Sequence, residues 1–182
     1  KVVTGAREKG LGQFQQRVVQ EVAPPGVTVN AHSGDVSRMV SQVSQAFDDA
    51  YDFAKGYPVA PKIMRTQGGD VPLGKAFVDA VKHRGTLATD DQRKKVGKFL
   101  SNELSQLRFR AAKSDDLISV RSHIRAAARG ESDKGARDLL KAAERAVTDA
   151  MDSQLPPDVT AALRLTDAQY GKFKILEDAV NR

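Results

Sequence analysis

Leu155-Pro156-Pro157-Asp158 separates two long stretches in which apolar residues recur at the spacing of an α-helix. The first stretch begins at Ser132 or Asp133 and ends near Met151, and the second runs to about Val180. Proline lacks an amide hydrogen and clashes with the preceding helical turn, so the double proline ends the first helix. Because the break is short, we expect a helical hairpin at the end of the chain.

The same periodicity recurs through the rest of the chain. It predicts five further helices, which begin near Arg7, Asp35, Pro72, Thr89 and Ser114. In the helix after Arg7, the residues expected on the buried face are Leu11, Phe14, Val18 and Val22. Thr89 and Gln92 have the spacing of a capping box. No stretch has a convincing strand pattern, so the predicted fold class is all-α: a multi-helix bundle or a stack of helical hairpins, with about seven helices.

The predicted domain organisation follows from the connection after the second helix. Residues 57–70 contain proline, glycine and lysine without helical periodicity, which favours a linker. We therefore expect an N-terminal helical hairpin over 1–56 and a helical bundle over 71–182, although the sequence also allows one continuous domain. The chain begins with Lys1 rather than methionine, which predicts a fragment of a larger protein or a processed product. Its apolar runs fall short of the roughly 20 residues that span a bilayer, so no transmembrane segment is predicted.

Four aromatic residues are predicted to anchor the packing or the assembly of the helices. They occupy the apolar stripes of the second and the last helix, and they are Phe47, Tyr51, Tyr170 and Phe173. An apolar stripe on a helix is usually covered by the same chain, but it can also pack on a neighbouring subunit. Both interpretations stay open for these stripes.

Positive charge is concentrated in the middle of the chain. Residues 92–129 hold 10 basic and 3 acidic side chains. Arg121, Arg125 and Arg129 lie four residues apart and share one helix face. The predicted contacts to DNA or phosphate are Arg93, Lys94, Lys95, Lys98, Arg121, Arg125 and Arg129. Such a stripe can follow a phosphate backbone, but it is more typical of a solvated helix face with local ion pairs.

The sequence favours a protein without catalytic chemistry. It has no cysteine, and its histidines, His32, His83 and His123, lie in three separate elements. That distribution lacks the ligand spacing of a zinc site. We therefore predict that the chain is not an enzyme and uses no metal, no cofactor and no small-molecule substrate.

Three blocks of sequence resemble a family of large virion-associated proteins of tailed bacteriophages and prophages. The first block comprises residues 12–19 and 24–27, and the second is Val43–Asp52. The third begins at Leu117–Ser122 and continues through 146–151, 155–157 and 169–179. The blocks occur in the order typical of that family, whereas Gly171 and the long connection over 56–70 depart from its pattern.

The resemblance implies a structural role in the virion, in the capsid interior or the tail. Copies of such an internal or ejection protein would assemble into a conduit that delivers the genome through the host envelope, with delivery of the protein to the host periplasm. The implied partners are other copies of the chain, other virion proteins and DNA. Three alternatives stay open: a nucleic-acid-binding helical module, the helical accessory region of a phage cell-wall hydrolase, and a tail tape-measure protein.

Overall fold

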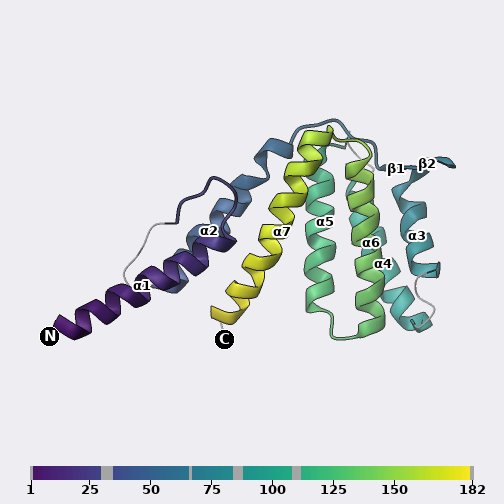
Figure 1. The fold of residues 1–182 in the computed structure, drawn as a ribbon. Coiled ribbons are helices and arrows are strands. Elements are labelled where there is room, and N and C mark those ends of the chain that lie inside the picture. Colours follow the sequence, from purple (N-terminus) through teal and green to yellow (C-terminus); the bar gives the residue numbers. More distant parts are fainter. Residues whose placement is uncertain (1, 30–34, 66, 84–87, 108–111, 181–182) are drawn as a thin grey trace. The chain divides into compact units, whose positions relative to one another are not determined.

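The computed structural model of the chain describes residues 2–29, 35–65, 67–83, 88–107 and 112–180 (Figure 1). These residues form seven α-helices and one two-stranded sheet, which confirms the predicted all-α class. The helices are α1 (Val2–Val22), α2 (Val36–Ala50), α3 (Leu73–His83), α4 (Asp90–Leu107), α5 (Ser114–Gly130), α6 (Lys134–Asp152) and α7 (Pro157–Val180). A 3-10 turn covers Asp52–Ala54, and the strands are β1 (Lys62–Arg65) and β2 (Gly69–Pro72). None of the described helices is both long and apolar enough to cross a membrane.

The chain divides into two compact units. The terminal unit contains Lys1–Phe53 and Ala161–Arg182, and the middle unit contains Ala54–Thr160. Most of α7 therefore belongs with α1 and α2, at the opposite end of the sequence. The N-terminal hairpin that the sequence predicted over 1–56 is thus completed by a helix from the C-terminal end.

The terminal unit is built around the inward faces of α1, α2 and α7. Its buried cluster consists of Val19, Ala23, Val29, Met39, Val40, Val43, Phe47 and Phe173. The Gln20 side chain binds the segment that follows α1. Its Nε2 donates to the Val27 carbonyl at 2.7 Å, and its Oε1 accepts from the Val29 amide at 2.7 Å. These bonds hold the returning segment against the end of α1 and place Val29 in the core.

The apolar stripe predicted in α1 meets the core only at its C-terminal end, where Val22 packs against the buried cluster. Val19 is 1% exposed, whereas Leu11 is 58% exposed and Phe14 is 64% exposed. The core is instead reached by Val19, near the C-terminal end of α1, and by Ala23, directly after the helix. The prediction that Leu11 and Phe14 are core residues is therefore wrong.

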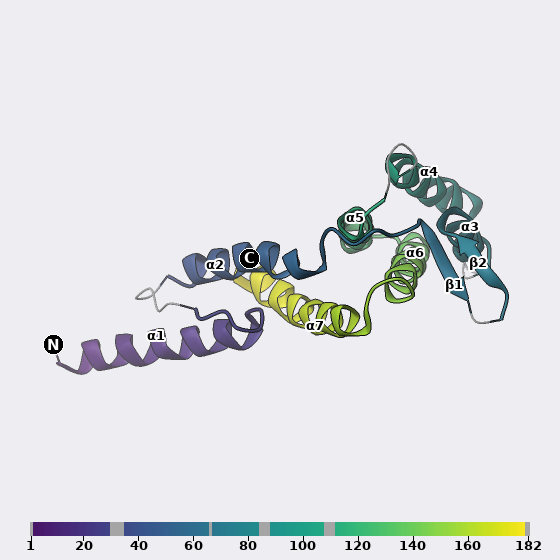
Figure 2. The same cartoon turned by 90° about the horizontal axis from the view of Figure 1, so that it is seen from above.

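In the middle unit, α6 contacts α3, α4, α5 and β1. In Figure 2, α6 lies between α5 and the α3 side of this unit. The buried side chains of α6 include Leu139, Ala143, Val147 and Ala150. The two alanines, Ala143 and Ala150, allow neighbouring helices to approach closely, since the distance between helix axes depends on the side chains at the contact.

The segment predicted as a linker is instead a folded part of the middle unit. Strands β1 and β2 pair in antiparallel register, with Ile63 opposite Val71 and Arg65 opposite Gly69. Before the hairpin, the Tyr57 amide donates to Ser114 Oγ at 3.0 Å, and the Ser114 amide donates to the Tyr57 carbonyl at 2.9 Å. The segment was misread because its strands are only four residues long and carry no clear alternation of apolar and polar residues.

Candidate functional site

The predicted arginine stripe on α5 is not a free phosphate-binding surface. Arg121 is only 4% exposed. Arg125 Nε donates to Glu144 Oε1 on α6 at 2.6 Å, so this guanidinium joins two helices of the middle unit. Arg129 is exposed at the end of α5. The prediction that Arg121 contacts DNA is therefore wrong for this fold, and Arg125 matches the alternative of a local ion pair.

On α4 the basic side chains have different surroundings. Lys94 and Lys98 are exposed, one helical turn apart. Lys95 Nζ lies 2.7 Å from Glu131 Oε2, and Arg93 lies 3.2 Å from Asp90. Contact of this helix face with DNA stays a prediction, in which Lys94, Lys95 and Lys98 are the exposed groups.

A polar cluster joins the first turn of α4 to the first turn of α6. The predicted capping box is confirmed: the Thr89 amide donates to Gln92 Oε1 at 2.6 Å, and the Gln92 amide donates to Thr89 Oγ1 at 3.3 Å. The Gln92 side-chain amide also donates to Asp133 Oδ2 at 2.7 Å. Gly135 permits this contact, because a Cβ there would lie 2.6 Å from the Gln92 side-chain oxygen.

Two carboxyl groups of this cluster have shifted pKa values. The Ala136 amide, which donates to Asp133 at 3.0 Å, lowers the pKa of Asp133, and the Gln92 side chain adds to this effect. The hydrogen bond from Lys95 lowers the pKa of Glu131, with a further contribution from the Asp133 amide. Both groups favour the charged form in the folded chain, and Asp133 in this form caps the start of α6.

The lowered pKa of Asp133 predicts acid sensitivity of the middle unit. A carboxyl group whose pKa is lower in the folded chain stabilises it above the unfolded pKa of about 3.9, and this stabilisation is lost as pH falls through the folded pKa. We expect Asp133→Asn, which keeps an N-cap acceptor without the charge, to flatten the decline of unfolding free energy below about pH 4. Urea denaturation at a series of pH values would measure this change. Asp138→Asn, at an exposed position of the same helix, is the control, and equal slopes for both variants would contradict the expectation.

Within the described residues, no group of three or more histidine, cysteine, aspartate or glutamate side chains is placed to hold a metal ion. His123 Nδ1 lies 2.9 Å from Glu103 on α4, as part of an exposed polar pair. His32 and the side chain of His83 fall outside the described residues.

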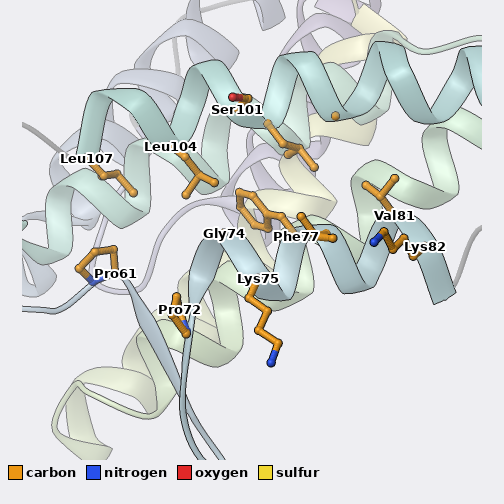
Figure 3. A pocket seen from close by; sticks show the side chains of 13 residues that line it. Pro61, Pro72, Gly74, Lys75, Phe77, Val81, Lys82, Ser101, Leu104 and Leu107 are labelled. Atoms are coloured by element: carbon orange, nitrogen blue, oxygen red, sulfur yellow. The ribbon is translucent and has the colours of Figure 1, made fainter.

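An apolar groove runs between α3 and α4 in the middle unit (Figure 3). Its volume is about 730 Å³. The residues that line it are Pro61, Pro72, Gly74, Lys75, Phe77, Val78, Val81, Lys82, Gly97, Leu100, Ser101, Leu104 and Leu107. A Cβ at Gly97 would meet no atom within 4 Å, so the small residues of α4 leave this space open. The sequence contains no signal for the groove, which depends on the distance between two helices.

The four predicted aromatic anchors lie in the terminal unit. The Phe47 ring is 5.2 Å from the Tyr170 ring in an edge-to-face arrangement and 5.3 Å from the Phe173 ring. The Tyr51 hydroxyl donates to Asp167 Oδ1 at 2.8 Å. These residues thus hold α2 and α7 together within one chain.

Other large apolar side chains of the terminal unit are exposed, on α7 and on α1. On α7, Leu165 is 54% exposed and Ile175 is 74% exposed, and on α1 the exposed pair is Leu11 and Phe14. The sequence analysis missed Leu165 and Ile175. Both are large apolar residues that lie outside the helix face of Tyr170 and Phe173.

Comparisons of the chain with family models, curated proteins and solved structures found no match. Its function is therefore inferred from the surfaces described above and from the resemblance in sequence.

Proposed function

We propose that this chain is a structural segment of a tailed-bacteriophage virion. In this proposal it belongs to an internal or ejection protein whose copies assemble into a conduit for genome delivery through the host envelope. The ordered blocks of sequence resemblance support the assignment to such a virion protein. The helical surfaces support the assembly role, and the proposal assigns no catalytic residue.

The observation that carries the assembly role is the uncovered face of α1. Leu11, Phe14 and half-buried Val18 have the i, i+3, i+7 spacing of one helix face. Covering a leucine or phenylalanine side chain contributes about 1.5–3 kcal/mol relative to leaving it in water. The terminal unit leaves Leu11 and Phe14 more than half exposed, so a neighbouring subunit that covers them gains this stabilisation.

We expect Phe14→Glu to weaken self-association of the purified chain by more than about tenfold, because a charged carboxylate would have to be desolvated in the contact. Light scattering after size exclusion, over a series of chain concentrations, would measure the change. Gln13→Glu adds the same charge at the neighbouring exposed position and should have little effect. A wild-type chain that stays monomeric throughout would contradict the assembly role, and its absence from purified phage particles would contradict the virion assignment.

The surroundings of the basic residues favour assembly over an independent nucleic-acid-binding module. Arg121 is buried and Arg125 is paired with Glu144, which removes two members of the predicted DNA-binding stripe. Contact with DNA in the proposed conduit would instead involve the exposed lysines of α4.

A further inference from the structure

The outer face of α7 has a second regular pattern. Its members are all exposed and are separated by alternating steps of four and three residues: Ala161, Leu165, Ala168, Lys172, Ile175 and Ala179. This is the spacing of the two apolar positions of a heptad, which form the seam of a coiled coil. The inner face of the same helix, with Phe173 at 0% exposure, already packs on α2. We call the outer set the α7 seam.

The α7 seam is complementary to itself when two copies run in opposite directions. In an antiparallel pair centred near Tyr170, Leu165 faces the partner's Ile175, and Ala161 faces the partner's Ala179. Each of the two large apolar residues then packs on the other, and each terminal alanine packs on an alanine. The same contacts occur twice about the axis, as an isologous two-fold interface requires.

The polar residues in and beside the α7 seam also favour an antiparallel pair. Lys172 faces the partner's Ala168, so its aliphatic stem can cover the small residue while its amine reaches water. Arg164 and Asp178 occupy the same flanking position two heptads apart, and the antiparallel register brings Arg164 beside the partner's Asp178. A parallel pair would instead set Lys172 against the partner's Lys172 and place like charges together.

Gly171 lies at the centre of this arrangement. It is exposed, and a Cβ at this position would meet no atom within 4 Å, so the glycine is not required by packing inside the chain. In the antiparallel register it flanks the seam beside the partner's Gly171. With alanine at Ala161, Ala168 and Ala179, this glycine lets the two helix backbones approach closely.

We propose that a second copy of this chain docks on the α7 seam as an antiparallel two-fold pair. This interface rests on the proposed assembly role and specifies one of its contacts. It is separate from the α1 surface around Phe14, so the two contacts together would allow copies to link into larger assemblies.

Single cysteines test the register directly, because the chain contains no cysteine of its own. Ala161→Cys and Ala179→Cys change two small exposed positions of the seam. In the antiparallel pair, Ala161 of one copy faces the partner's Ala179. Ala161 is then separated from the partner's Ala161 by 18 residues, or about 27 Å along the helices, and the same holds for the two copies of Ala179. That distance exceeds the Cα separation of about 7 Å that a disulfide can bridge.

Under mild oxidation, we therefore expect disulfide-linked dimers when the two variants are mixed and not when either is oxidised alone. Ser122→Cys, at an exposed position on α5, is the control. Mixed with either seam variant in place of the other, it should give no linked dimer. Adding Leu165→Glu to both seam variants should lower the yield of linked dimer by more than about tenfold, and adding Lys172→Leu should raise it.

The outcomes separate this proposal from the proposed function. Dimers formed by either variant alone would show a parallel pair and overturn the antiparallel interface. No linked dimer in any mixture, while self-association still depends on Phe14, would overturn the seam and leave the assembly role standing. A chain that neither links nor associates would overturn both.

Discussion

Replacing Phe173 with alanine is expected to lower the free energy of unfolding of the terminal unit by about 3–5 kcal/mol. Phe173 is fully buried, and its ring packs 5.3 Å from Phe47. The truncation removes apolar contacts and leaves a cavity between α2 and α7. A loss of this size is a large part of the stability of a small domain.

Hydrogen exchange followed by mass spectrometry would locate the effect of Phe173→Ala. We expect faster exchange in peptides from α1, α2 and the part of α7 after Ala161, with the middle unit protected as in the wild type. Phe14→Ala is the matched control, since it removes the same ring from a side chain that is mostly exposed in the same unit. Equal destabilisation by both variants would show that the core is not centred on Phe173.

Replacing Gln154 with leucine is expected to destabilise the middle unit by about 2–4 kcal/mol. Gln154 lies in the connection between α6 and α7. Its side-chain oxygen accepts from the Ala60 amide at 2.7 Å, and its nitrogen donates to the carbonyls of Ala60 and Lys62 at 2.8 and 2.9 Å. The leucine fills a similar volume but removes these bonds. The Ala60 amide loses its acceptor, whereas the Ala60 carbonyl keeps the bond from the Lys62 amide.

Chemical denaturation would measure the loss in Gln154→Leu, and hydrogen exchange would show whether the β1 segment opens first. Gln106→Leu, at an exposed position on α4, makes the same change of side chain without these bonds and should stay within about 0.5 kcal/mol of the wild type. If Gln154→Leu is equally mild, the hairpin is held by its apolar contacts instead.

Much of the helical architecture could be predicted from the sequence because it depends on local signals. The double proline at 156–157 separates α6 from α7, and Thr89 with Gln92 starts α4 by closing a capping box. These signals act within a few residues, so they can be read without knowledge of the partners. The aromatic stripes of α2 and α7 likewise identified the residues that meet in the terminal unit.

The remaining features depend on partners that lie far away in the sequence. Gln154 recognises backbone groups more than 90 residues earlier, and no local pattern identifies that contact. The sequence correctly placed Arg121 and Arg125 on one helix. The burial of Arg121 and the ion pair of Arg125 depend on how α5 packs within the middle unit. Leu11 and Phe14 show the converse case, in which an apolar stripe has no partner in its own unit.

The division of the terminal unit between the two ends of the chain determines the order in which the protein can fold during synthesis. Residues 1–53 emerge from the ribosome before the middle unit, but Phe47 lacks its partner until Phe173 has been made. All residues of the middle unit emerge in between, so that unit can fold first, as domains generally do during translation. Until α7 has been made, the α2 face around Phe47 lacks the helix that covers it.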